Sequence, residues 1–587
     1  AFSVVETSDG GLAIAGDTGP FLNGDAWLIK TDSNGNKEFD RTFGGEDGDS
    51  ASSVVETSDR GLALAGSTGS FNSGSDNDAW LIKTDSNGNK EFDKTFGGAD
   101  RDQAFSVVET SDGGFALAGS TESFDTGTRN AWLIKLSPTT GSPPDCSIVS
   151  YPGMGTDGNP YKVGNVDQLQ CIEEQGLDAY YEAVSDIDAS GTSSWDDGKG
   201  FKPIGSPGSN TEFNGTFDGQ DHNITDITID RGSESSVGLF GAVGSAGTVM
   251  NVGVVDVDIN GSVNVGGLVG RNDGGTVESS YATGTVDSPD RKAGGLVGEN
   301  DGGAVENSYA AASIGGSAIL GGLVARNDGG TITESYATGA IDGSSTVGGL
   351  VGVNRDGMIT ESHATGVVKS SRFTGGLVGS NDGGTIESSY ATESVTSSLR
   401  YAGGLAGKNE EGTIIDVYAT GSVDGDNSVG GLVGWNKDGT ITESYATGSV
   451  DGSSRVGGLV GQNQGDIREA TVSESFATGE VEGSGLVGGL VGDNIEGKVE
   501  SSYATGAVSS SFPSSTVGGL VGQNRDGTIT ESYAAGAVSG ADGSVASVGG
   551  LVGYNSGTVT ESYANGDVSG ERDVGGLVEG VGERALQ

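Results

Sequence analysis

The chain has 587 residues, and its 82 acidic and 30 basic side chains give a net charge of −52. Such a surface repels phosphate backbones and anionic lipids, which excludes nucleic-acid binding and direct membrane insertion as expected functions. With 33% apolar residues and 110 glycines, the composition is typical of a disordered chain or of a repeat fold with a thin interior. Regular spacing of the large apolar residues favours the repeat fold.

The acidic residues are spread along the whole sequence instead of gathering in one segment. An acidic surface keeps a protein hydrated and soluble at high salt, and it can also collect divalent cations. The even spread favours a salt-adapted, halophilic surface. We therefore expect no cofactor, with calcium as the one candidate.

Residues 1–141 contain three copies of a unit of 50 to 53 residues, which begin at Ala1, Ala51 and Ala104. Each copy reads as short strands, S-V-V-E-T, A-L-A-G-S-T and A-W-L-I-K, and the first two copies add K-E-F-D-x-T-F. Four strands in about 50 residues is the length of a propeller blade. The copies resemble the blade-like repeats of bacterial and archaeal exported proteins. We expect an antiparallel array, either part of a propeller or an open stack.

The D-S-N-G-N segments of this array are weak calcium candidates, because oxygen ligands stand at alternate positions as in the start of an EF-hand loop. The sixth and twelfth positions lack the glycine and glutamate of that loop, and Asn-Gly favours a hairpin turn instead. The candidate ligands are Asp32, Asn34, Asn36, Asp85, Asn87 and Asn89.

Residues 142–236 are predicted to form a linker, a capping helix and the first strands of a second domain. Val166, Leu169 and Ile172 have helical spacing, with Asn165 as the N-cap. A helix here would cover an open strand edge. Cys146 and Cys171, 25 residues apart, are consistent with one disulfide in an exported protein, and two free thiols are the alternative.

Three Asn-x-Ser/Thr triplets are glycosylation candidates in an exported chain, at Asn214, Asn223 and Asn260. The chain starts at Ala1, within a repeat and without a signal peptide. We therefore expect a processed or partial chain that functions outside the cell or at its surface.

Residues 237–587 repeat the phrase G-G-L-V-G-x-N, with its leucine at Leu239, then from Leu268 to Leu577 at intervals of 26 to 31 residues. Apolar residues at strand period, frequent β-branched residues and Asn-Asp-Gly-Gly turns predict a right-handed parallel β-solenoid of about twelve coils. Stacking at ~4.8 Å would give a rod roughly 55 Å long.

Equivalent residues of the coils are expected to stack into structural ladders. One column is aromatic, from Tyr281 to Tyr563, with His363 and Phe476 as exceptions. A second column is the asparagine of each phrase, namely Asn272, Asn300, Asn327, Asn354, Asn381, Asn409, Asn436, Asn463, Asn494, Asn524 and Asn555.

The phrases G-G-L-V-G-x-N and S-Y-A-T-G, with the lead-in from Phe213 to Ile229, resemble the GLUG-motif repeats of bacterial and archaeal cell-surface proteins. The resemblance covers about 60% of the chain. It implies a surface protein of solenoid fold. Some relatives carry such repeats beside a zinc peptidase that cleaves immunoglobulins, but this chain has only His222 and His363 and no H-E-x-x-H motif.

The sequence thus predicts a non-catalytic adhesion or cell-surface interaction protein, not an enzyme. Its expected partners are other surface proteins, glycans or neighbouring cells, with self-association as a further expectation. The residue before each ladder asparagine varies from Arg271 to Tyr554, and this mixed chemistry indicates an ordinary solvated face. The valine of each phrase, from Val269 to Val578, forms an outward stripe if the strand alternates strictly, or lies inside if the strand bends.

Two other functions stay open at this point. A polysaccharide-processing enzyme is an alternative by fold analogy, because parallel β-helices host lyases and hydrolases. An ice-binding surface is another, since threonine pairs at Thr331/Thr333, Thr440/Thr442, Thr528/Thr530 and Thr558/Thr560 would share one outward face. Glu278, Glu306 and Glu387 interrupt that array.

Overall fold

The computed structural model describes residues 1–587 apart from 20–23, 46, 58–59, 72–76, 99, 111–113, 124–128, 137–142, 145, 148, 209, 542–546, 571–573 and 577–587. Two units are distinct, residues 1–140 and residues 141–587. Leu577 and Val578, the last members of the predicted leucine and valine columns, lie outside the described residues. Within the described part, no helix is both long and apolar enough to cross a membrane.

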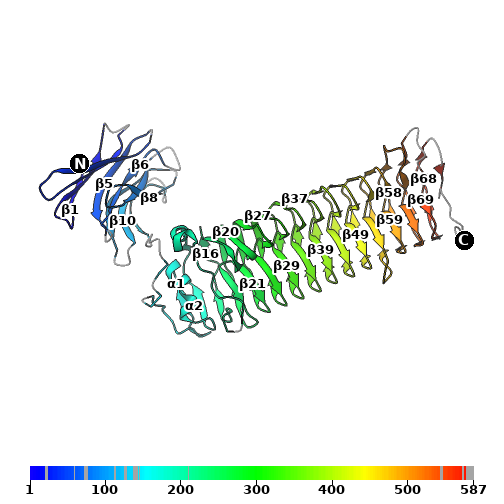
Figure 1. The fold of residues 1–587 in the computed structure, drawn as a ribbon, viewed down its shortest axis with the longest axis horizontal. Helices are drawn as coiled ribbons and strands as arrows, with labels where there is room; N and C mark the ends of the chain where they lie inside the picture. Colours follow the sequence, from blue (N-terminus) through cyan, green and yellow to red (C-terminus); the bar gives the residue numbers. More distant parts are fainter. Residues whose placement is uncertain are drawn as a thin grey trace. The chain divides into compact units, whose positions relative to one another are not determined.

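Unit 1 consists of three antiparallel sheets, one for each copy of the first repeat (Figure 1). The sheets confirm the predicted antiparallel array. Their strands are β1 (Ser3–Glu6), β2 (Leu12–Asp17), β3 (Ala26–Thr31) and β4 (Lys37–Phe43); β5 (Asp49–Glu56), β6 (Leu62–Thr68), β7 (Asp78–Thr84) and β8 (Lys90–Phe96); and β9 (Asp102–Glu109), β10 (Phe115–Thr121) and β11 (Asn130–Leu136).

Consecutive sheets of unit 1 pack face to face around small alanines and large aliphatic residues. Leu28 of the first sheet and Leu64 of the second belong to one buried cluster, and Leu81 and Leu117 belong to the next. Equivalent backbone hydrogen bonds join the copies. The amide of Asp49 donates to the carbonyl of Gly24 over 2.6 Å, and the amide of Asp102 donates to the carbonyl of Asn77 over 2.7 Å.

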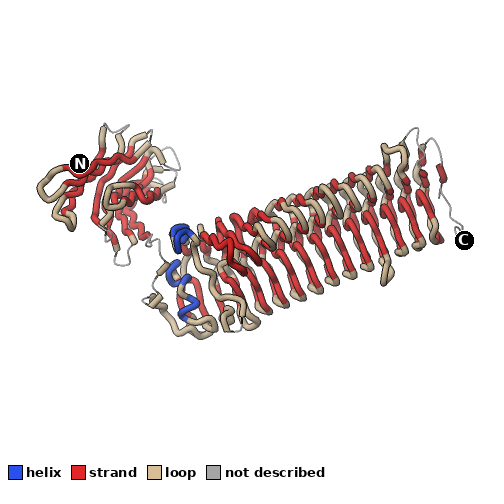
Figure 2. The backbone as a smooth tube through the Cα atoms, viewed as in Figure 1, coloured by secondary structure: helices blue, strands red, loops and turns tan. Residues whose placement is uncertain are grey.

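Unit 2 begins with a cap that contains all the helices of the described chain (Figure 2). These are α1 (Val166–Gln170), α2 (Ile172–Gln175) and the short 3-10 helices η1 (Ser190–Ser194) and η2 (Asp196–Gly198). Asn165 is the N-cap of α1, since its Oδ1 accepts from the amide of Gln168 over 2.9 Å. Val166 and Leu169 are buried in the same core as the solenoid, so the helix covers the first coils as predicted.

The rest of unit 2 is a parallel solenoid, as predicted from the repeat phrase. One coil contains five strands, β33 (Thr346–Gly348), β34 (Val351–Arg355), β35 (Met358–Thr360), β36 (His363–Ala364) and β37 (Val368–Ser370). Each strand pairs in parallel with its equivalent in the next coil, for example Val351 with Val378. The glycine pair before Leu350 permits the close approach of coils, because a Cβ on Gly349 would lie 2.0 Å from the carbonyl oxygen of Gly376.

The strands stack into three sheets along the solenoid. The asparagine sheet has twelve strands, β18 (Phe240–Val243), β21 (Val269–Asp273), β25 (Val297–Asp301), β29 (Val324–Asp328), β34, β39 (Val378–Asp382), β44 (Ala406–Glu410), β49 (Val433–Lys437), β54 (Val460–Gln464), β59 (Val491–Ile495), β64 (Val521–Arg525) and β69 (Val552–Asn555). Figure 1 shows β21, β29, β39, β49, β59 and β69 in this order along the solenoid.

The two other sheets complete the coils. The threonine sheet has fifteen strands and runs from β12 (Tyr161–Val163) and β13 (Tyr180–Ala183) through the β35 position to β70 (Thr558–Thr560). The tyrosine sheet contains the β33, β36 and β37 positions and runs from β14 (Ile187–Asp188) to β73 (Val574–Gly575). The core lies between the three sheets.

The predicted columns are present, the asparagine column in the interior and the aromatic column half-exposed. Each ladder asparagine is fully buried and donates through Nδ2 to Oδ1 of the next, in an unbroken series from Asn272 to Asn555 with distances of 2.7–2.8 Å. The aromatic column stacks with ring centroids 4.7–5.3 Å apart from Tyr281 to Tyr563, and His363 lies in register within it. These ladders stabilise every coil in the same way.

Both the leucine and the valine of each phrase are buried, as at Leu268 and Val269. The strand therefore bends at the glycine pair, and strict alternation is the wrong alternative. No outward valine stripe exists among the described coils. The bend has a further consequence on the outside of the solenoid, where it brings the side chains of two neighbouring strands together.

The variable ledge, a candidate binding site

Outward side chains on the two sides of the bend form two columns that face each other, which we call the ledge. The first column is the residue two positions before the glycine pair: Asn264, Lys292, Ile319, Thr346, Phe373, Tyr401, Ser428, Arg455, Leu486, Thr516 and Ser547. The second is the residue before each ladder asparagine: Arg271, Glu299, Arg326, Val353, Ser380, Lys408, Trp435, Gln462, Asp493, Gln523 and Tyr554.

Side chains of the two columns contact each other across the corner. Lys292 Nζ lies 2.7 Å from Glu299 Oε1, and Arg455 Nε lies 3.1 Å from Asp493 Oδ2. Ser428 Oγ donates to Gln462 Oε1 over 3.4 Å. Each of these pairs joins a residue of the first column to a residue of the second. The ledge side chains therefore pack on one another along the solenoid.

This packing corrects the expectation of an ordinary solvated face for the second column. Glu299 is 7% exposed and Asp493 is not exposed, while Val353 and Ser380 are also buried. The bend at the glycine pair is the physical reason, since it folds the first column over the second. Five members of the second column are therefore buried, whereas the other six are half-exposed.

Basic side chains neutralise both buried carboxylates of the ledge. Asp493 contacts Arg455 and Arg525. Around Glu299, burial alone would raise the pKa of the carboxyl, but the hydrogen bond from Lys292 and the charges of Arg271 and Arg326 outweigh it. The pKa of Glu299 thus lies below its ordinary value, and this carboxylate is ionised at neutral pH.

The middle of the ledge contains an aromatic–lysine cluster. The rings of Phe373 and Tyr401 stack with centroids 5.3 Å apart, and Tyr401 stacks on Trp435 at 5.0 Å. Lys408 Nζ lies 5.8 Å from the ring centroid of Phe373 and 5.9 Å from that of Trp435, within cation–π range.

Neighbouring charges and one indole complete the cluster. Lys408 forms ion pairs with Asp382 and Glu410, and Lys437 Nζ lies 3.0 Å from Glu410. The indole Nε1 of Trp435 is buried and has no hydrogen-bond partner among the described residues. The half-exposed rings, and not this nitrogen, are what the cluster offers to a partner.

The repeat phrase did not predict the ledge as a unit, because the residues of the first column share no common type. A signal was present. Three consecutive coils carry Phe373, Tyr401 and Trp435 at ledge positions, where the flanking coils carry no aromatic residue but Thr346 and Val353 on one side and Arg455 and Gln462 on the other. An alignment of the coils would have revealed this aromatic run, although not that the three rings touch.

The weak calcium candidates lie in hairpin turns. Asp32 Oδ1 accepts from the amides of Asn34 and Asn36 at 2.9 and 2.8 Å, and Gly35 has a φ of +83° between β3 and β4. Asp85 makes the same bonds with Asn87 and Asn89. Each carboxylate serves its own turn, which lowers its pKa mainly through the side chain of the second asparagine. In the described part of the chain, no three His, Cys, Asp or Glu residues gather as metal ligands.

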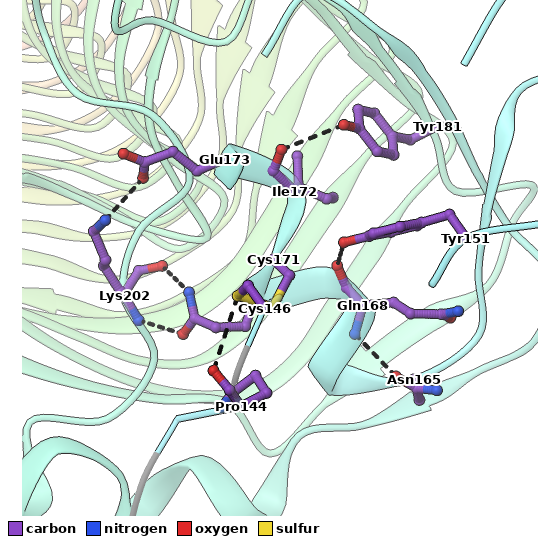
Figure 3. The surroundings of a disulfide bond; sticks show 11 residues. Pro144, Cys146, Tyr151, Asn165, Gln168, Cys171, Ile172, Glu173, Tyr181 and Lys202 are labelled. Carbon is purple, nitrogen blue, oxygen red and sulfur yellow. Dashed lines mark hydrogen bonds and ion pairs between the residues drawn. A yellow bond between two sulfur atoms is a disulfide. The ribbon is translucent and has the colours of Figure 1, made fainter. Parts of the chain in front are cut away.

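Cys146 and Cys171 are joined by a disulfide with an S–S distance of 2.00 Å, at the end of α1 (Figure 3). Beside it, Gln170 donates to the carbonyl of Lys202 over 3.0 Å, and Lys202 pairs with Glu173. The disulfide therefore fastens the incoming chain to the cap.

The three glycosylation candidates lie on the first coils, where each is half-buried. Asn223 Oδ1 accepts from the hydroxyl of Tyr281 over 2.6 Å, and Asn260 donates to Asp230 over 2.9 Å. Asn214 donates to the carbonyl of Glu212 over 3.2 Å. Their glycosylation stays a prediction.

The threonine pairs lie on the threonine sheet, but acidic residues stand in the same columns. Thr333 pairs in register with Glu306, and Thr360 pairs with Glu387. An ice-binding array needs uninterrupted hydroxyl groups. The sheet does not offer a long regular array of this kind.

Eight segments of the solenoid match the family model described as the GLUG motif, residues 261–287, 343–369, 374–396, 398–424, 425–451, 452–482, 514–539 and 544–569. The chain carries GLUG motifs. One match, 343–369, contains Thr346 and Val353, so a GLUG repeat supplies both columns of the ledge. The resemblance seen in the sequence is thereby confirmed.

Two curated relatives share part of the chain. Halomucin of Haloquadratum walsbyi is 38% identical over 146 residues, which are 24% of this chain and 2% of halomucin. A provisionally named Gly-rich membrane protein of Evansella cellulosilytica is 33% identical over 133 residues, 22% of this chain and 15% of that protein. The match therefore spans only a small part of either relative.

Two solved structures also resemble the chain. A provisionally named immunoglobulin A1 protease from Bacteroides ovatus has a TM-score of 0.35 at 23% identity, covering 41% of this chain and 77% of that one. An IgA1 protease has a TM-score of 0.28 at 15% identity, covering 68% and 26%. At such scores the likeness says nothing about the activity of this chain.

Proposed function

We propose that the chain is a non-catalytic interaction protein of the cell surface and that the GLUG ledge is its contact surface. The observation that carries this proposal is the arrangement of the variable residues. Ladders of leucine, asparagine and aromatic residues hold the coils, while two columns of residues that differ between coils contact each other at one corner. A rigid scaffold with variable positions is a common design of binding solenoids.

The aromatic–lysine cluster is the proposed centre of recognition. Tryptophan and tyrosine are enriched among the few residues that dominate the energy of protein contacts. Tyr401 and Trp435 are of this kind, and they stack on each other with Lys408 in cation–π range of Trp435. The proposed partners are glycans or proteins on the surface of neighbouring cells.

Three features support an extracellular location of the protein. The Cys146–Cys171 disulfide suits an oxidising environment. The names of the relatives, halomucin and a Gly-rich membrane protein, fit the cell envelope. The net charge of −52 suits a high-salt medium, where screening shortens the range of repulsion between acidic chains.

The absence of catalysis is proposed from the state of the ledge carboxylates. A polysaccharide lyase or hydrolase needs a carboxyl that can give or take a proton near neutral pH. Glu299 is instead held as the charged partner of Lys292, and its pKa is shifted away from neutrality, while Asp493 pairs with Arg455 and Arg525.

The test uses the full chain on a glycan array and on intact cells, with uronic-acid polymers assayed for cleavage in parallel. The proposal expects reversible binding without release of shorter sugars. Cleavage of a polymer would contradict the proposal and favour a polysaccharide-processing enzyme. Thermal hysteresis in the purified protein would instead favour the ice-binding alternative.

A further inference from the structure

Two arginines flank the aromatic–lysine cluster of the ledge, and they differ from its lysines in having no acidic partner. Lys408 pairs with Asp382 and Glu410, and Lys437 pairs with Glu410 and Asp466. The charges of the two lysines are therefore neutralised within the protein.

Arg372 and Arg400 hold equivalent positions of adjacent coils. Thr374 pairs in register with Ala402, so the two arginines, each two residues earlier in the chain, are neighbours. Both are exposed, and among the described residues neither forms an ion pair. The guanidinium of Arg372 instead lies over the ring of Phe373, with its carbon atom 5.5 Å from the ring centroid.

This pair of arginines departs from the charge pairing of the rest of the ledge. Every basic residue in the two columns has a carboxylate partner, namely Lys292, Arg271, Arg326, Lys408 and Arg455. Acidic residues outnumber basic ones by 82 to 30 in the chain, so partners are plentiful. Like charges at neighbouring positions of paired strands repel each other. An anion from outside the protein would relieve this repulsion between the two arginines.

The rings beside the arginines provide half-exposed apolar surface. Phe373, Tyr401 and Trp435 stack in a row along the coils. The coil before Phe373 carries the small side chains of Thr346 and Val353, so in the described structure Tyr401 is the one ring that stacks on Phe373. A ligand that contacts both the rings and the arginines has to present an apolar ring face beside an anionic group.

We propose that the ledge binds an acidic saccharide, whose sugar rings pack on the aromatic stack and whose carboxylate or sulfate groups pair with Arg372 and Arg400. The C–H face of a sugar ring is apolar and packs on aromatic rings. A guanidinium binds a planar carboxylate or a tetrahedral oxyanion through two parallel hydrogen bonds. An acidic saccharide repeats both groups along its length, whereas an acidic peptide offers carboxylates without ring faces. This proposal rests on the proposed function, because it names the ligand class of the same ledge.

The acidic surface of the rest of the chain does not prevent such binding. Salt limits the range of repulsion to about 8 Å at physiological ionic strength and to about 3 Å at 1 M. Groups in direct contact with the ligand therefore decide its affinity, and at this cluster they are rings and arginines.

The test compares matched saccharides as ligands of the full chain. The probes are an oligogalacturonate, its neutral methyl ester, a sulfated galactan of the same length, and polyglutamate as the acidic peptide. Wild type is expected to bind an acidic saccharide at least about tenfold more tightly than the neutral ester, because charge-assisted hydrogen bonds form only with the anion. Polyglutamate should bind more weakly than the acidic saccharide, and the first and third probes show which anion is preferred.

Arg372→Gln/Arg400→Gln removes both charges and keeps the rings. It should weaken binding of the acidic saccharide at least about tenfold and leave binding of the neutral ester unchanged. Lys199→Gln/Lys498→Gln, in the cap and on the threonine sheet, removes two basic groups elsewhere and is the matched control. It should bind as wild type does. Circular dichroism checks that both variants are folded.

Several outcomes would overturn the proposal. They are equal binding of the acidic saccharide and the neutral ester, an acid preference that survives both arginine substitutions, polyglutamate bound as tightly as the saccharide, and a wild type that binds no probe. In the first three cases, loss of binding by Tyr401→Ser/Trp435→Gln would still support the ledge as the contact surface. Unchanged binding by that aromatic variant would instead mean that the proposed function itself is wrong.

Discussion

Asn354 donates through Nδ2 to Oδ1 of Asn381 across 2.8 Å in the interior of the solenoid, and neither side chain is exposed. This bond is one step of the ladder that joins every coil from Asn272 to Asn555. It keeps neighbouring coils in register without placing any constraint on the ledge residue beside it. The ladder therefore explains how the ledge can vary while the scaffold stays constant.

Replacing Asn381 by alanine should destabilise the solenoid. The substitution removes the acceptor of Asn354 and the donor of Asn409, and a buried polar group left without its partner costs about 1–3 kcal/mol. Urea unfolding followed by circular dichroism measures the loss. Thr385→Ala, a half-buried outward position in the same coil, is the control and should change little. Equal effects of the two substitutions would contradict the role of the ladder.

The His363 position should make stability depend on pH. Burial between Tyr336 and Tyr390 lowers the pKa of His363 below its ordinary value of 6.5. As pH falls through 6.5, the unfolded chain takes up this proton before the folded chain does, so folding stability decreases toward the lower, folded-state pKa. His363→Tyr should remove this decrease. The measurement compares melting temperatures of both proteins from about pH 8 to about pH 5. Parallel curves would show that the histidine does not titrate as described.

Glu299→Gln should destabilise the ledge, because it leaves Lys292, Arg271 and Arg326 without their shared carboxylate. Breaking a buried ion pair by removing one partner costs about 3–5 kcal/mol. Since its pKa is lowered, Glu299 stabilises the fold above the ordinary value of 4.5, and this contribution is lost as pH falls through the folded pKa. Glu306→Gln, on the threonine sheet of the same coil, should have a much smaller effect on the melting temperature. A larger effect at Glu306 would argue against the charge cluster.

Reduction of the Cys146–Cys171 disulfide should loosen the cap without affecting distant coils. A disulfide of this loop length contributes about 2–4 kcal/mol, and coils of a solenoid interact only with their neighbours. Hydrogen exchange should therefore accelerate in α1 and around Tyr181 after reduction. Strands near Asn524 serve as the internal control. Uniform acceleration along the whole chain would mean that the disulfide stabilises more than the cap.

Much of the fold could be predicted because the repeat makes it visible. Leucine, asparagine and tyrosine recur at fixed positions, and each recurrence is a stacking column in the structure. The ledge could not be predicted in this way. Periodicity does not say whether a strand alternates or bends at Gly266 and Gly267, and only the bend buries both Leu268 and Val269. The same bend turns an expected solvated face into a packed corner.

Two structural roles in the coils could not be predicted from the residue types in the sequence. The serine that precedes most residues of the aromatic column bridges coils, since Ser335 Oγ accepts from the amide of Ser308 over 3.1 Å. The residue before that serine, often a glutamate, adopts left-handed backbone, as at Glu334 with a φ of 49°. Neither property follows from residue type, because serine is unremarkable in strands and glutamate rarely takes positive φ.

The most direct test of the account is quantitative binding by the double variant Tyr401→Ser/Trp435→Gln, with a ligand taken from the glycan array or from intact cells. Thr440→Ala/Thr442→Ala, on the threonine sheet, is the matched control. If the ledge is the contact surface, the aromatic variant should lose at least about tenfold in affinity with a circular dichroism spectrum that shows an intact fold, while the control binds as wild type does. Normal binding by the aromatic variant, together with loss of binding by the threonine variant, would contradict the account.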